Sequence, residues 1–140
     1  MTIVALIVVA ACSNRTDEDP LRAHLSELLH RHGTTPAEMS CPELEGGAQA
    51  TCEFRTPREK LDLAITGLRL TQVDKPTIYY AEEKCRTIPA FSDRNRIALY
   101  ESARHGPELR LSNGRAFEYL ILYQDLSSDE VCAQFAYADQ

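Results

Sequence analysis

Residues 108–123 read ELRLSNGRAFEYLILY and predict an antiparallel pair of strands. Asn113-Gly114 is the strongest hairpin signal in the chain, because both residue types tolerate the positive φ angles of a two-residue turn. The run from Tyr119 to Tyr123 is apolar at every position, which is typical of a strand buried on both faces. The fold is therefore expected to be built on an antiparallel sheet.

Shorter β-compatible runs lie upstream of this hairpin. Residue alternation predicts a strand at 48–54, and the short runs 69–73 and 77–81 are compatible with strands. Residues 96–102 fit either a strand or a helix, and the alternation of Ile97 and Leu99 favours a strand. Gly46-Gly47 predicts a second two-residue hairpin turn, whose register places Cys41 opposite Cys52. The segment 85–94 contains Pro89 and has no clear period, so we expect a loop there.

Three helices are expected around the sheet. Asp19 as cap and Pro20 at the first position begin one helix that ends at Gly33, with Leu21, Leu25, Leu28 and Leu29 on its buried face. The capping box Thr56-Pro57-Arg58-Glu59 predicts a second helix to Gly67 with Leu61, Ala64, Ile65 and Leu68 inward, and Ser127-Ser128-Asp129-Glu130 predicts a third with Val131, Cys132 and Phe135 inward. Residues 20–140 are thus expected to form one α+β domain: a small antiparallel sheet packed by an N-terminal, a middle and a C-terminal helix, with two disulfides.

The N-terminal stretch MTIVALIVVAACS, residues 1–13, is an apolar run that stops at Cys12. It has about half of the roughly 20 residues that a spanning helix needs, but it suits the apolar region of a secretory signal. The order Val9-Ala10-Ala11-Cys12 resembles the lipobox of bacterial lipoprotein precursors. The resemblance implies that residues 1–11 are a cleaved signal peptide and that Cys12 becomes an N-terminus carrying acyl chains such as palmitate.

This resemblance covers residues 1–13 alone, and no family is recognised in the rest of the chain. No Lys or Arg precedes the apolar run, which departs from the usual signal; either translation starts further upstream or the positive region is unusually weak. An ordinary signal peptide that a cysteine follows by chance is the alternative interpretation. Residues 12–19, with the polar stretch SNRTDED, are expected to tether the domain to the lipid.

The cysteine count agrees with a lipid on Cys12. Five cysteines are an odd number, and assigning one to the lipid leaves Cys41, Cys52, Cys85 and Cys132 as an even set for an oxidising compartment. Three pairings are possible. The Gly46-Gly47 register favours Cys41–Cys52, with Cα atoms about 5.5 Å apart in a hydrogen-bonded pair, which leaves Cys85–Cys132 to pin the last helix to the sheet. Without a CxxC pair or a histidine at ligand spacing, no zinc site is predicted.

The search for a catalytic constellation returns no catalytic, metal or cofactor residue. The chain has no G-x-S-x-G, no phosphate-binding glycine loop and no H-E-x-x-H. His24 and His30 face different ways on their helix, so His24, His30 and His32 are expected on a solvated face, and His105 suits a turn. The carboxylates Glu82, Glu83, Asp125, Asp129 and Glu130 are expected to be exposed.

Composition and motifs together favour a non-enzymatic protein. With 44% hydrophobic and 26% charged residues, the chain has the ordinary composition of a globular domain. Its net charge of −6 does not suggest the basic surface that a nucleic-acid-binding protein needs. We expect a membrane-anchored cell-envelope lipoprotein that binds or scaffolds, held by the lipid on Cys12 and contacting an envelope protein partner. The serine that follows the cysteine, Ser13, resembles the residue at this position in lipoproteins that are sorted to the outer membrane. If the host has two membranes, we therefore expect the protein on the outer membrane, facing the periplasm. The alternatives are a small exported hydrolase whose site is invisible in sequence and a protein inhibitor of an envelope hydrolase.

Overall fold

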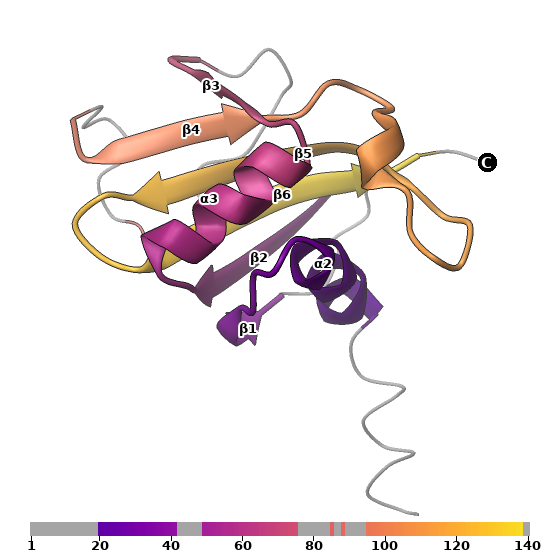
Figure 1. Ribbon diagram of the computed structural model, residues 1–140, viewed down its shortest axis with the longest axis horizontal. Helices are drawn as coiled ribbons and strands as arrows, with labels where there is room; N and C mark the ends of the chain where they lie inside the picture. The colour runs from indigo at the N-terminus through magenta and orange to yellow at the C-terminus, as the bar shows by residue number, and fades with distance from the viewer. Residues whose placement is uncertain (1–19, 42–48, 76–84, 86–87, 89–94, 139–140) are drawn as a thin grey trace, which may run out of the picture.

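A computed structural model of the chain describes residues 20–41, 49–75, 85, 88 and 95–138. These residues form one antiparallel six-stranded sheet in the order β1-β2-β6-β5-β4-β3, with two α-helices (Figure 1). The elements are α2 (Pro20–Arg31), β1 (Ala37–Ser40), β2 (Gln49–Arg55), α3 (Arg58–Gly67), β3 (Thr71–Val73), β4 (Ile97–Glu101), the short 3-10 helix η2 (Pro107–Leu109), β5 (Phe117–Asp125) and β6 (Glu130–Tyr137).

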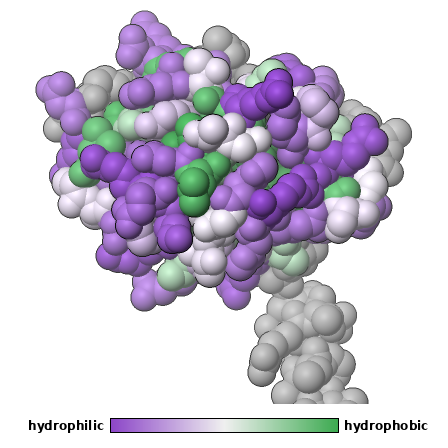
Figure 2. All heavy atoms as spheres, viewed as in Figure 1, coloured by the Kyte–Doolittle hydropathy of each residue, from purple (hydrophilic) through white to green (hydrophobic). Residues whose placement is uncertain are grey.

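Both helices pack on one face of the sheet, called here the helix face (Figure 1). The predicted apolar stripes point inward, because Leu25, Leu28 and Leu61 are completely buried in one core with Phe54 and Phe135 from the sheet. On the side seen in Figure 2 the surface is mostly hydrophilic, and its hydrophobic areas are small and separate. The amphipathic pattern of each helix therefore explains how this face is covered.

The opposite face of the sheet has a second core. Leu99 from β4 and Ile121 and Tyr123 from β5 pack there with Cys85 and Ile88, which are themselves buried. β5 is thus buried on both faces, as its uninterrupted apolar run predicts. The predicted strand at 77–81 and most of the predicted loop at 85–94 lie outside the described residues.

The predicted C-terminal helix is wrong, because residues 130–137 form strand β6 between β2 and β5. Its residues alternate, with Val131 and Phe135 on the helix face and Cys132 on the second face. The expected capping serines instead form the turn before β6, where the Ser127 backbone N–H donates to Asp125 Oδ1 and the Glu130 N–H donates to Ser128 Oγ. Short polar side chains stabilise either a helix start or a turn, and here a strand gains ladder hydrogen bonds with two neighbours.

The predicted middle helix is present, but its predicted cap is not used. Pro57 occupies the N-cap position of α3 with no side-chain cap hydrogen bond. Thr56 is buried, and its hydroxyl has no hydrogen-bond partner among the residues that the structure describes. The Thr56 backbone N–H instead donates to the carbonyl of Asp129 over 3.0 Å, which ties the start of α3 to the β5–β6 turn.

The β1–β2 pair has the register that the sequence predicts. Ser40 lies opposite Glu53, which continues to Cys41 opposite Cys52. The register shifts before Ser40, where Glu38 adopts a φ of 55°. An extra residue in one strand of this kind is a β-bulge, which bends the edge of a sheet. The turn at Gly46-Gly47 itself lies outside the described residues.

Candidate functional site

Two disulfides join the four paired cysteines as Cys41–Cys52 and Cys85–Cys132. The Cα atoms of Cys41 and Cys52 are 4.2 Å apart, which corrects the expected hydrogen-bonded pair, because the close, non-hydrogen-bonded type has a spacing of about 4.5 Å. The Cys85–Cys132 bridge holds Cys85 against strand β6 rather than a helix against the sheet. Cys12 lies outside the described residues.

A β-bulge in β5 places Phe117 beside the polar cluster at the N-terminal helix. The register between β5 and β6 shifts between Phe117 and Tyr119, so that these residues point to opposite faces although they are two apart. Phe117 therefore lies on the helix face, stacked on Phe135 with ring centroids 4.4 Å apart and opposite Tyr137. Bulges commonly redirect a side chain in this way.

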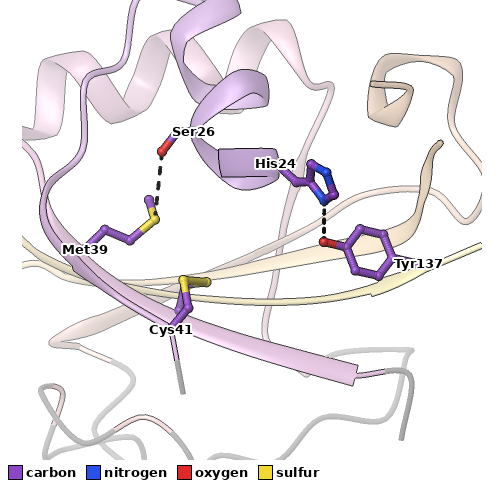
Figure 3. Close-up of a disulfide and its surroundings, with 6 residues drawn as sticks. His24, Ser26, Met39, Cys41 and Tyr137 are labelled. Carbon is purple, nitrogen blue, oxygen red and sulfur yellow. Dashed lines mark hydrogen bonds between the residues drawn. A yellow bond between two sulfur atoms is a disulfide. The ribbon is translucent and has the colours of Figure 1, made fainter. Parts of the chain in front are cut away.

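Tyr137 is the centre of this cluster. Its phenol oxygen shares a hydrogen bond of 2.6 Å with Nδ1 of His24 from α2 (Figure 3). The Arg115 guanidinium lies over the Tyr137 ring, with Cζ 4.2 Å from the ring centroid, in a cation–π contact. The other imidazole nitrogen of His24 lies 3.5 Å from Asn113 Nδ2. Helix α2, the 112–115 turn and the end of β6 therefore meet at one histidine.

Glu27 makes a second connection between α2 and the same turn. Its carboxylate accepts hydrogen bonds of 2.7 Å from both the backbone N–H and the hydroxyl of Ser112, and it pairs with Arg31 over 3.0 Å. Although burial opposes ionisation, these hydrogen bonds hold the pKa of Glu27 below its ordinary value. The Ser112 hydroxyl thus donates to a carboxylate, and His24 is engaged with a phenol.

Burial and the nearby Arg115 guanidinium lower the pKa of His24, with burial the larger cause. The imidazole is therefore neutral at neutral pH. A neutral imidazole can accept at one nitrogen and donate at the other, which matches its two polar neighbours, Tyr137 and Asn113. These contacts directly support a structural role, in which His24 attaches helix α2 to strand β6.

The outcomes for the other candidate residues differ. His30 is exposed as expected, whereas the half-buried His24 corrects the expectation of a solvated face. His32 is also partly buried: it packs against Gly67, and its Nε2 has no hydrogen-bond partner in the described part of the chain. His105 lies in a turn, with a φ of 57°.

Asp125 was expected to be exposed but is 2% exposed. Arg96 donates two hydrogen bonds of 3.2 Å to its carboxylate, and Ser127 adds two more. These contacts, the Arg96 hydrogen bonds first, hold the pKa of Asp125 well below its ordinary value. Among the other predicted carboxylates, Asp129 is exposed and Glu130 pairs with Arg55 over 2.6 Å. Glu82 and Glu83 lie outside the described residues.

Three hollows that are lined by described residues lie around the loop between β4 and β5. The first, of about 220 Å³, lies between Leu68 of α3 and Pro107, and the second, of about 380 Å³, is lined by Val73 and Arg104. The third, of about 250 Å³, is lined by His105 and Arg110 among small residues. Sequence reasoning missed these hollows, because each is lined by segments that are far apart in the sequence: 68–73 with 101–109, or 105–116 with Ala138.

Comparison with protein-family models, curated proteins and solved structures gives no match for this chain. In the described part of the chain, no helix is long and apolar enough to cross a membrane. The same residues contain no group of three or more His, Cys, Asp or Glu side chains that could hold a metal ion.

Proposed function

We propose that this chain is a lipid-anchored protein of the cell envelope that acts by binding rather than by catalysis. One observation carries the lipid anchor: the chain has five cysteines, and four of them form two disulfides, so that Cys12 is the odd one. Cys12 also ends the Val9-Ala10-Ala11-Cys12 stretch that resembles a lipobox. Two disulfides suit an oxidising compartment outside the cytoplasm.

The proposed anchor and the His24 cluster are linked through α2. This helix begins at Pro20, directly after the tether of residues 12–19. His24 and Glu27 attach its exposed side to the 112–115 turn, and Leu25 attaches its inner side to the core. We infer that these two sets of contacts connect the membrane-anchored segment firmly to the sheet.

The hydrogen bonds of Ser102, Ser112 and His24 favour a binding role over a serine hydrolase. A serine hydrolase needs a serine hydroxyl hydrogen-bonded to a histidine, and the histidine hydrogen-bonded in turn to a group that orients it. Here the Ser112 hydroxyl donates to Glu27, and the Ser102 hydroxyl accepts the Leu120 backbone N–H in the interior. Each of these groups has a structural partner. The surface hollows around the 102–110 loop are the features we propose for partner contact.

The lipid anchor is tested by changing Cys12 to Ser in cells fed a labelled fatty acid. The variant should not incorporate the label and should accumulate as unprocessed precursor. It should therefore be absent from the pool of acylated protein in the membrane fraction. Ser13→Ala is the matched control, and it should keep both label and processing. Equal labelling of the wild type and Cys12→Ser would show that the lipobox interpretation is wrong.

The catalytic alternative is tested by His24→Gln. If the cellular phenotype disappears while folding and membrane attachment stay intact, an enzyme is favoured over a binding protein. We expect no such separation, because the structural role of His24 predicts loss of stability first.

A further inference from the structure

The hollow beside the 112–115 turn is lined by basic side chains, although the chain as a whole has a negative net charge. The chain has a net charge of −6, yet the lining of this hollow by the described residues includes Arg110 and His105 and no carboxylate. The remaining lining residues are small or apolar: Gly106, Pro107, Gly114, Ala116 and Ala138. A concave surface with one guanidinium and an apolar wall is suited to a small amphipathic anion.

Arg110 differs from five other described arginines in having no carboxylate partner among the described residues. Arg31, Arg69 and Arg104 each pair with a glutamate at 3.0 to 3.2 Å. Arg55 and Arg96 pair with carboxylates as well. Arg110 is exposed and has no carboxylate partner among the residues described. A guanidinium has a planar donor fork that matches the two oxygens of a carboxylate.

The frame around Arg110 is fixed by the backbone. Arg110 and Ala116 form a β-bridge, and the Leu111 N–H donates to the Arg115 carbonyl over 2.7 Å. Leu109 and Leu111 anchor the loop in the core, since both are buried. The Ala138 N–H donates to the Ala116 carbonyl, which fixes the far wall. A ligand would therefore meet a preformed hollow with little ordering to do.

His105 is held at the rim by an unusual backbone conformation. Its φ of 57° lies in the left-handed region, and its N–H donates to the Glu118 carbonyl over 2.7 Å. Glu118 is the residue at the β5 bulge and pairs with Arg104, and its carboxylate lies 3.9 Å from His105 Nε2. Glu108 also lies near the hollow, behind Gly106, but it pairs with Arg69. Both nearby carboxylates thus have arginine partners.

We infer that the hollow formed by Arg110 and His105 binds a small aliphatic carboxylate, either a free acid or the C-terminal residue of a peptide. Its volume of about 250 Å³ lies below the roughly 300–1,000 Å³ of most ligand pockets, which limits the occupant to a group of this size. Arg110 holds the carboxylate, His105 contacts it from the rim, and Pro107 and Ala116 face the aliphatic part. The inference deepens the proposed binding function and rests on it for its biological setting.

The test is a titration of the purified full-length chain, in mild detergent, with three probes followed by the backbone amide signals of Gly114 and Ala116 in NMR spectra. The probes are N-acetylalanine, N-acetyl-alanyl-alanine and N-acetylalanine amide. The two acids should shift the signals with saturation, and the amide should not. Tighter binding of the dipeptide identifies a peptide end, and equal binding identifies a free acid. Absence of saturable shifts, or equal binding of the amide, overturns the inference.

Matched variants separate the site from general charge effects. Arg110→Gln should weaken binding by about 10-fold or more, because a charge-assisted hydrogen bond is lost, and Arg110→Lys should restore part of it. His105→Asn should weaken binding several-fold, because the imidazole contact is lost. Asparagine is the replacement because it tolerates the left-handed backbone conformation. Arg55→Gln, which removes an exposed arginine that pairs with Glu130 at the opposite end of β6 from Ala138, should leave affinity within about twofold. Equal losses in Arg55→Gln and Arg110→Gln would refute the site, while acylation at Cys12 would remain a separate question.

Discussion

Nδ1 of His24 in the first helix lies 2.6 Å from the phenol oxygen of Tyr137, 113 residues further along the chain. The rings meet edge to face at 89°, and Arg115 lies over the tyrosine. This contact joins α2 to β6 in the middle of the sheet, and it adds one titratable ring to the contacts that attach α2.

We expect acid to weaken this attachment. Burial and Arg115 lower the pKa of His24 in the folded state below the ordinary value of 6.5. The unfolded chain therefore binds a proton more readily, so the free energy of unfolding falls as the pH drops from 6.5 toward the folded pKa. Thermal unfolding between pH 7.5 and pH 5 should show this decrease in the wild type and less of it in His24→Gln. The exposed His30→Gln is the control, and a pH dependence equal in wild type and His24→Gln would contradict the assignment.

Asp125→Asn should destabilise the protein at neutral pH by about 2 kcal/mol, because the buried Asp125 carboxylate accepts hydrogen bonds from Arg96 and Ser127 that a neutral amide cannot all accept. The folded pKa of Asp125 is lowered, so its contribution is complete above the ordinary value of 3.8 and disappears as the pH falls below it. Urea unfolding at pH 7 and at pH 3 should therefore give a smaller difference between variant and wild type at pH 3. A difference that is the same at both pH values would mean that the ion pair is not its cause.

The two disulfides should contribute unequally. Cys85 and Cys132 are 47 residues apart and Cys41 and Cys52 are 11 apart. Loop-closure entropy then gives about 4 kcal/mol for the first bridge and about 3 kcal/mol for the second. Removing each bridge by paired alanine substitutions and measuring urea unfolding tests this order, and a larger loss from Cys41→Ala with Cys52→Ala would reverse it.

Phe135→Ala should cost about 3–5 kcal/mol, the range for removing a fully buried aromatic ring. Phe135 is completely buried on the helix face and stacks on Phe117. Leu63→Ala on the outer surface of α3 is the control, since Leu63 is 49% exposed, and it should change stability by less than about 0.5 kcal/mol. A small effect of Phe135→Ala in chemical denaturation would argue against β6 as a central strand.

Local patterns predicted the parts of this fold that depend on neighbouring residues. The leucine spacing of α2, the Gly33 that ends it with a φ of 80°, and the two-sided apolar run of β5 are all local signals that the structure confirms. Residues 127–130 carry an equally strong helix signal, but pairing of β6 with both β2 and β5 overrides it. Such pairing joins residues far apart in sequence, so no window of the sequence contains it.

The candidate site was hidden for the same reason. His24 lies beside Leu25 at the border of the apolar stripe of α2, and that position was the one local sign that it could be partly buried. Its partner Tyr137 lies two residues after Phe135 on the helix face of β6, a strand that the sequence predicts as a helix, and the bulge at Glu118 brings Phe117 beside it. A bulge adds one residue to a strand and leaves no mark in an apolar run.

The position of β6 has a consequence for how the chain reaches its native state. β6 is the last strand in sequence, yet it lies between β2 and β5. Until it is inserted, β1–β2 and β3–β4–β5 are two unconnected ribbons, each with an unpaired edge. Folding therefore waits for nearly the whole chain to be synthesised, and the dominance of distant contacts makes it slow. A polypeptide built this way stays open while it is made, and an open chain is the form that can be threaded across a membrane before it closes.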